Sequence, residues 1–360
     1  MTTVHATAPT PAPACADRSE GRTEPGLLRG SWARAGGLAV AGGVLAVLVG
    51  CSLALGSKPL PLGTVIDAFV HFDGSSDHLI VRSLRVPRTV LGLGVGAALG
   101  VAGVLMQGVT RNPLADPGLL GVEAGAALAV VIGIHSFGVA SLGGYVWFAF
   151  AGAALASAVV YTLGSVGRGG ATPVKLALAG AALTWLLASL TQAILLFDVQ
   201  TFDQYRFWVV GSLAGRGGDV VWQVAPFLVL GTGLALAVGR SLDVLVLGDD
   251  MARSLGMRVA RTRATATLAV VVLTGAAVAA CGPIAFVGLT IPHVARAISG
   301  PGHRRLLAWS LVLGPILLLG ADILGRVVMR PAELQVGVVT ALVGAPFFVA
   351  LVRRRKLAAV

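Results

Sequence analysis

Ionisable side chains inside apolar segments are the residues of this sequence with the clearest capacity for chemistry. Asp322 precedes Arg326 by four residues, a spacing that places both side chains on one helix face, so we expect them to pair. Glu123, His135 and His293 lie near the ends of other apolar segments. Charged groups within a bilayer are costly and often functional. These groups are too few and too peripheral for the acid relay of an ion-coupled carrier, and we interpret both histidines as satisfied interfacial residues rather than ligands.

Nucleotide-binding and hydrolytic motifs are absent. The sequence contains no GxxxxGK[ST], and none of its lysines (Lys58, Lys175 and Lys356) follows a glycine. HExxH and GxSxG are absent too, which argues against an intramembrane protease or hydrolase. The three cysteines form no CxxC or Cys/His cluster. We therefore predict no catalytic residue, no metal site and no directly bound cofactor.

Three loops carry the next candidates for function. The first runs from Arg111 to Gly121 and contains Pro113 and Pro117, which impose a non-helical path. Asn112 and Asp116 can accept hydrogen bonds from the backbone donors that this path leaves free. A simple tight turn between membrane spans is the alternative interpretation.

The second loop, Leu242–Arg263, contains a predicted short helix. Asp249 and Asp250 can cap its start, and Gly256 can end it. An exposed Leu255 on such a helix suits docking of a soluble partner. A basic loop that faces lipid is the alternative.

The third segment is Arg85-Val-Pro-Arg88, at the start of an apolar run. Its two arginines can hold lipid phosphate, or they can receive acidic residues of an external protein by bidentate pairing.

Composition indicates what must position these residues. The chain has 360 residues, of which 56% are hydrophobic and 12% charged, with a formal net charge of +11. Soluble domains are about 25% charged, so we predict an all-α, polytopic transmembrane helical bundle. A span needs ~20 apolar residues, and the apolar runs predict about ten spans joined by polar connections. The predicted spans are Ala35–Gly56, Thr89–Thr110, one from near Gly118, one from near Gly144, Leu176–Phe197, Val220–Gly239, two divided at Gly282-Pro283, Leu306–Arg326 and Leu334–Val352.

Lysine and arginine positions predict the orientation. Most of the 27 basic residues fall on the cytoplasmic side if both termini are cytoplasmic. Residues 1–34 then form a disordered cytoplasmic tail, residues 35–354 the transmembrane domain and residues 355–360 a second cytoplasmic tail.

Arg85–Thr89 resembles Arg258–Thr262, which suggests an inverted repeat that equates the second span with the seventh. Chance similarity between helices rich in alanine and glycine is the alternative.

Taken together, the motifs resemble the permease family of iron-siderophore and cobalamin ABC importers over about residues 35–354. The matching motifs are Arg85-Val-Pro-Arg88, Gly96-Ala-Ala98, Gln107, Asn112-Pro-Leu-Ala115, Pro117, Leu120-Gly121, Gly125-Ala126, Trp208, Gly211-Ser212-Leu213, Leu247-Gly248, Ala252, Leu255-Gly256, Gly282 to Gly288, Ile291 to Arg296, Ala321-Asp322, Arg326, Glu333, Gly337, Thr340 and Gly344-Ala-Pro-Phe347.

This resemblance implies a transport subunit of a bacterial plasma membrane that has no enzymatic activity of its own. It would work as a pair, with a second copy or a sister permease, driven by ATP hydrolysis in two cytoplasmic ATPase subunits and supplied by an extracytoplasmic substrate-binding protein. Ferric siderophore import is the expected function; cobalamin or haem import and an ion-coupled secondary carrier are the alternatives. The residue roles that the resemblance implies are binding-protein docking by Arg85, Arg88 and Arg326; ATPase coupling by Leu247, Gly248, Ala252, Leu255 and Gly256; and a translocation path bordered by Gln107, Asn112, Pro113, Leu114 and Pro117.

Overall fold

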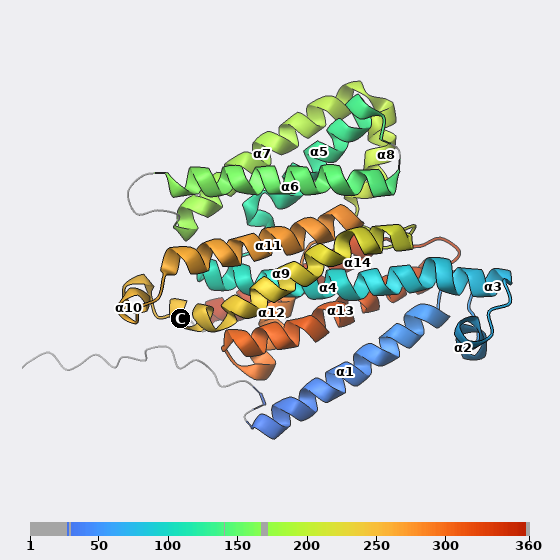
Figure 1. Ribbon diagram of the computed structural model, residues 1–360, viewed down its shortest axis with the longest axis horizontal. Coiled ribbons are helices and arrows are strands. Elements are labelled where there is room, and N and C mark those ends of the chain that lie inside the picture. The colour runs from blue at the N-terminus through green and yellow to red at the C-terminus, as the bar shows by residue number, and fades with distance from the viewer. Residues whose placement is uncertain (1–26, 29, 140, 167–171, 358–360) are drawn as a thin grey trace, which may run out of the picture.

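The computed structural model describes residues 27–28, 30–139, 141–166 and 172–357. Over these residues the chain folds into helices without any strand, which confirms the predicted all-α class (Figure 1). Residues 1–26 and 29 of the predicted N-terminal tail and residues 358–360 of the predicted C-terminal tail lie outside the described residues. The predicted tail boundaries are wrong where they can be compared, because α1 already begins at Ser31 and α14 continues to Leu357.

The helices follow one another with short connections. They are α1 (Ser31–Ala54), α2 (Leu62–Val70), α3 (Ser76–Leu79), the π-helical segment η1 (Ile80–Arg85), α4 (Val86–Thr110), the 3-10 turn η2 (Pro117–Leu120), α5 (Val122–Phe137), α6 (Leu142–Ser165), α7 (Pro173–Phe197), α8 (Val199–Val209), α9 (Gly218–Leu245), α10 (Asp249–Ser254), α11 (Val259–Cys281), α12 (Val287–Ser299), α13 (His303–Val328) and α14 (Val336–Leu357).

Seven helices within the described residues are long and apolar enough to cross a membrane. Two shorter apolar stretches are Val122–Phe137, which is α5, and Val336–Leu351 of α14; α12 has 13 residues. Each of the ten predicted spans therefore has a helix, but α5 and α12 are short and only part of α14 forms an apolar stretch, so the number of crossings stays a prediction. The predicted connections are less simple than expected, because α2 and α8 are helices of their own.

Both predicted breaks in the long apolar runs are confirmed. The first lies between Phe137, where α5 ends, and Leu142, where α6 begins. The second follows α11, where Gly282 has a φ of +77° and α12 begins only at Val287. A residue with a side chain rarely adopts such a φ, and proline follows directly, so the helix cannot continue.

The order of helix lengths supports the inverted repeat. The series α1, α4, α5, α6 and α7 has 24, 25, 16, 24 and 25 residues. The series α9, α11, α12, α13 and α14 has 28, 23, 13, 26 and 22 residues, with the shortest helix again in third place. The equivalent helices α4 and α11 pack together and run in opposite directions (Figure 1).

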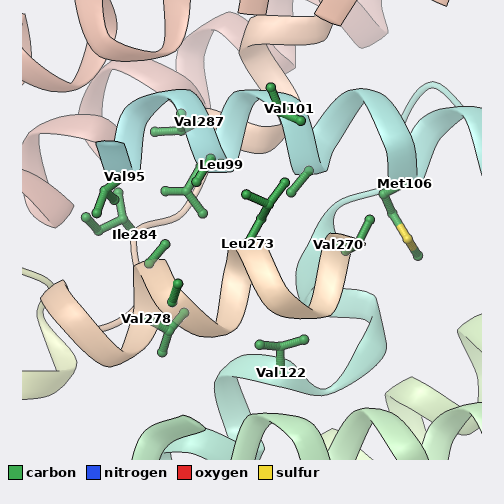
Figure 2. Packing of buried hydrophobic residues seen from close by; sticks show 14 of the residues in the cluster. Val95, Leu99, Val101, Met106, Val122, Val270, Leu273, Val278, Ile284 and Val287 are labelled. Atoms are coloured by element: carbon green, nitrogen blue, oxygen red, sulfur yellow. The ribbon is translucent and has the colours of Figure 1, made fainter. Parts of the chain in front are cut away.

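Helix α4 forms the centre of the bundle. In the most apolar 18-residue stretch of the segment that contains α4, 78% of the residues are buried, whereas in that of α1 only 6% are buried. It packs against α13, α11, α9 and α12, and Figure 2 shows Val95 and Leu99 among apolar side chains of the surrounding segments. A Cβ atom on Gly103 would lie 1.9 Å from the carbonyl oxygen of Gly288 in α12. Small residues thus let the backbones touch, and such close packing is one of the forces that associate helices in a bilayer.

Replacing Gly103 with alanine is expected to destabilise the protein, because the added methyl group forces α4 and α12 apart. Overpacking of this kind costs about 1–3 kcal/mol, so the Tm of the detergent-solubilised protein should fall by several degrees. Gly320→Ala is the control, since its Cβ would meet no atom within 4 Å. Equal melting temperatures for the two variants would contradict the close contact.

Candidate functional site

A buried ion-pair network lies at the end of the bundle where α1 ends and α4 begins. Arg88, in the first turn of α4, donates to the Asp322 carboxylate of α13 from Nε at 3.2 and 3.1 Å and from Nη2 at 2.8 Å. Its Nη1 donates to Glu333 at 2.7 Å. The Asp322 side chain is 1% exposed, so the low local dielectric strengthens the attraction between these charges.

Arg326 shares the same carboxylate. Its Nη2 lies 2.7 Å from Asp322 Oδ2, which confirms the predicted pairing of these two residues. The guanidinium also donates from Nη1 to the carbonyl oxygens of Ser52 and Leu55, at 3.0 and 2.9 Å, and from Nη2 to Ser52 Oγ at 2.9 Å. No local pattern indicates Arg88 as a third member of the network, because it lies 234 residues from Asp322 in the chain.

Arg85 completes the attachment of α1. Its Nη1 donates to the carbonyl oxygens of Leu53 and Ala54, at 2.6 and 2.7 Å, and its Nη2 donates to that of Lys58. The last carbonyls of a helix have no partner within the helix and carry partial negative charge. Two arginines therefore supply the hydrogen bonds that the end of α1 lacks.

The predicted docking arginines are thus engaged inside the protein. Arg85 and Arg326 are 6% and 2% exposed, and the side chain of Arg88 is 13% exposed. Together with Glu333 they line a cavity of about 450 Å³. A docking role for these arginines stays a prediction, and it requires each of them to exchange an internal partner for an external one.

The predicted short helix of the second loop is α10, at the opposite end of the bundle (Figure 1). Leu247 and Leu255 are each 63% exposed, whereas Ala252 is fully buried. Gly248 and Gly256 flank the helix with φ values of +111° and +79°. The five predicted coupling residues therefore divide into an exposed apolar pair, one residue that packs inward and two glycines, one before the helix and one after it.

Asp249 connects α10 to the bundle, a link that sequence reasoning missed. Its Oδ1 accepts from Nη2 of Arg263 in α11 at 3.0 Å and from Nη2 of Arg111, directly after α4. The sequence had suggested Asp249 only as a helix cap. No spacing rule reveals the pair with Arg111, because the two residues are far apart in the chain.

The first loop forms the hydrogen bonds expected of it. Asn112 Oδ1 accepts from the backbone nitrogen of Leu114 at 2.9 Å, and Asp116 Oδ1 accepts from that of Gly118 at 2.8 Å. These side chains fix the non-helical path between α4 and α5.

The predicted path residues do not form one cluster. Gln107 is buried inside α4 and accepts from Arg296 Nη2 at 3.1 Å. Pro117 packs against α12 near Gly288, whereas Asn112 and Leu114 are exposed. Their place beside a translocation path stays a prediction.

The two histidines have protein partners, as expected. His135 Nδ1 lies 2.7 Å from Asp198 Oδ2, and His293 Nδ1 lies 2.8 Å from the carbonyl oxygen of Leu289. Hydrogen bonds from Thr201 and from His135 lower the pKa of Asp198, which keeps this carboxylate ionised beside the imidazole.

A bundle of long apolar helices, with a buried ion-pair network at one end and exposed leucines flanking a short polar helix at the other, is typical of a polytopic membrane protein. The chain belongs to the FecCD transport family, whose family model matches residues 44–354. It is 48% identical over 331 residues to the ferric enterobactin transport system permease protein of Escherichia coli (strain K12). The aligned region covers 91% of this chain and 98% of that protein. It is 37% identical over 327 residues to the cobalamin import system permease protein of Halobacterium salinarum, with coverage of 88% and 87%.

A solved structure agrees with the fold. It is described as an inward-facing conformation of a metal-chelate type ABC transporter, and it matches with a TM-score of 0.79 and 28% identity over 89% of this chain and 99% of that chain. The resemblance to the permease family seen in the sequence is therefore confirmed.

Replacing Asp322 with asparagine is expected to destabilise the protein strongly, because Arg88 and Arg326 lose their shared negative charge. Removing one partner of a buried ion pair costs about 3–5 kcal/mol, so we expect a large fall in Tm and in the yield of monodisperse protein.

Asp203→Asn is the matched control, since it removes a half-exposed partner of Arg206, and surface pairs contribute about 0–1 kcal/mol. If both variants melt like the unmodified protein, the network does not hold this end of the bundle together.

Proposed function

We propose that the chain is the membrane permease subunit of an ABC importer that carries a ferric siderophore across a bacterial plasma membrane. The observation that carries the proposal is family membership together with 48% identity, over nearly the full length of both chains, to a permease named for ferric enterobactin transport. ATP is hydrolysed by two separate cytoplasmic subunits, and a second permease copy or a sister permease completes the membrane pair.

The exposed surface of α10 is the proposed contact with the ATPase subunits. Leu247, Met251 and Leu255 present apolar side chains there, with exposures of 63%, 54% and 63%. Such exposed apolar groups mark interaction sites. The proposal therefore has α10 and both termini on the cytoplasmic side, and the distribution of basic residues supports this orientation.

The opposite end, with Arg88 and Glu333, is then extracytoplasmic and is the proposed contact with the substrate-binding protein. The Glu333 side chain is 30% exposed. A carboxylate of the binding protein can therefore compete with Glu333 for Arg88, which is how an internally paired arginine would take part in docking.

Helix α4 provides a mechanical connection between the two ends. It begins at the Arg88 network and ends beside Arg111, whose guanidinium is held by Asp249 of α10. A shift of α10 on its ATPase partner is therefore transmitted to α4 and to the Asn112–Gly121 loop. This motion alternates the translocation path between outward and inward openings.

Uptake measurements test the proposed function. Vesicles that contain the permease, its ATPase and its binding protein should accumulate a ferric siderophore only when ATP is supplied. Accumulation of cobalamin or haem in its place would favour those substrates, and cobalamin import has a specific supporting relative. Uptake that continues without ATP while an ion gradient is held would overturn the ABC assignment in favour of a secondary carrier.

Asp249→Asn is expected to uncouple ATP hydrolysis from transport. The change removes the negative charge that ties α10 to Arg111 and Arg263, but it leaves the exposed leucines in place. The ATPase should still co-purify and hydrolyse ATP, while substrate transported per ATP falls several-fold.

Asp250→Asn is the matched control, because Asp250 is fully exposed and pairs with Arg253 of the same helix. Equal coupling ratios in the two variants would contradict the proposed role of Asp249.

A further inference from the structure

Arg216, in the loop between α8 and α9, is a buried guanidinium whose charge has little compensation. It is 6% exposed, and its Nε donates to the carbonyl oxygen of Ser212 at 3.4 Å. Over the residues that the structure describes, its electrostatic neighbours are the Tyr145 phenol and the Cys281 thiol rather than a carboxylate. Burial lowers the pKa of Arg216. By contrast, Arg88 binds two carboxylates.

Two cavities meet at this residue. The cavity of about 450 Å³ that contains the Arg88 network also has Arg216 in its wall. A second cavity of about 430 Å³ is lined by Arg216, Tyr145, Gln204 and Trp208, and its lining residues include no aspartate or glutamate. A guanidinium between two cavities, with no acid beside it in the second, is a site at which an incoming anion would be attracted.

The residues that line the second cavity also carry aromatic rings and hydrogen-bond donors. Trp208 Nε1 is buried and has no hydrogen-bond partner within the described residues. Tyr145 Oη donates to Gln204 Oε1 at 3.0 Å, which leaves the amide nitrogen of Gln204 as a donor. Phe207 adds an exposed ring to the wall. Buried donors without partners are costly, so a ligand that accepts hydrogen bonds relieves that cost.

We propose that Arg216 and Trp208 form a binding site for an anionic, aromatic iron chelate as it passes from the extracytoplasmic side into the permease. The guanidinium binds the negative oxygen atoms of the chelate, Trp208 Nε1 donates to one of them, and the aromatic rings of the cavity stack on those of the ligand. The inference rests on the proposed function and adds a substrate class to it. A carboxylate from a second permease subunit is the competing occupant.

The test uses the full chain assembled with its partner subunits in lipid nanodiscs, and the ferric tris-catecholate complex as the anionic probe. Binding of radioactive iron is measured by equilibrium dialysis, and ATP-driven uptake is measured in vesicles. Arg216→Gln removes the charge, Arg216→Lys keeps it, and Arg206→Gln changes an exposed arginine on α8 that pairs with Asp203.

We expect Arg216→Gln to weaken probe binding roughly tenfold or more, since charge-assisted hydrogen bonds are lost. Arg216→Lys should retain most of the binding, and Arg206→Gln should bind like the unmodified protein. Trp208→Phe, which loses only the Nε1 donor and some ring area, should weaken binding about threefold. It keeps the proposal testable if Arg216→Gln fails to fold.

Unchanged probe binding in Arg216→Gln, or in Trp208→Phe where Arg216→Gln does not fold, would overturn the inference. Loss of subunit pairing with unchanged probe binding would also overturn it, and would assign Arg216 to the contact between subunits. Probe binding that depends on Arg216 without ATP-driven uptake would instead support the site and count against the proposed function. Normal uptake with no effect of either variant would keep the function and remove the site.

Discussion

The carboxylate of Asp322 is the negative charge around which one end of the bundle is organised. It lies between Arg88 and Arg326, and two positive charges on one carboxylate need further compensation in a low-dielectric interior. Glu333 supplies part of it. The carbonyl oxygens at the end of α1 supply the rest, and Arg85 binds the same helix end. These bonds, together with the packing of α1 against α13, attach α1 to the bundle.

Helix α4, which carries Arg88, links that network to the far end of the molecule. Helix α4 has 25 residues, about 37 Å at 1.5 Å per residue, and it carries Arg88 near its start and Arg111 just past its end. Glycines along it bring the neighbouring backbones into contact, so α4 packs tightly against α12 and α13. In the proposed transport cycle, this helix is the connection between the ATPase contact and the translocation path.

The proposed substrate contacts lie in a different part of the structure. Arg85, Arg88 and Arg326 donate their hydrogen bonds to acceptors within the protein. They therefore contribute to stability rather than to binding a ligand. Arg216 and Trp208 keep unused donors beside a cavity without acids. That contrast separates structural arginines from a candidate binding arginine, although all four lie near the same end of the bundle.

The sequence by itself determined the all-α class, the two broken apolar runs, the pairing of Asp322 with Arg326 and the short helix from Asp249. These features depend on local composition or on spacings of a few residues, where helix periodicity and breaking by glycine or proline act directly. Tertiary structure alone decided that Arg88 shares Asp322, that Arg85 binds the end of α1 and that Asp249 binds Arg111. Those contacts join residues far apart in the chain, and no local pattern indicates which charges a folded bundle will bring together.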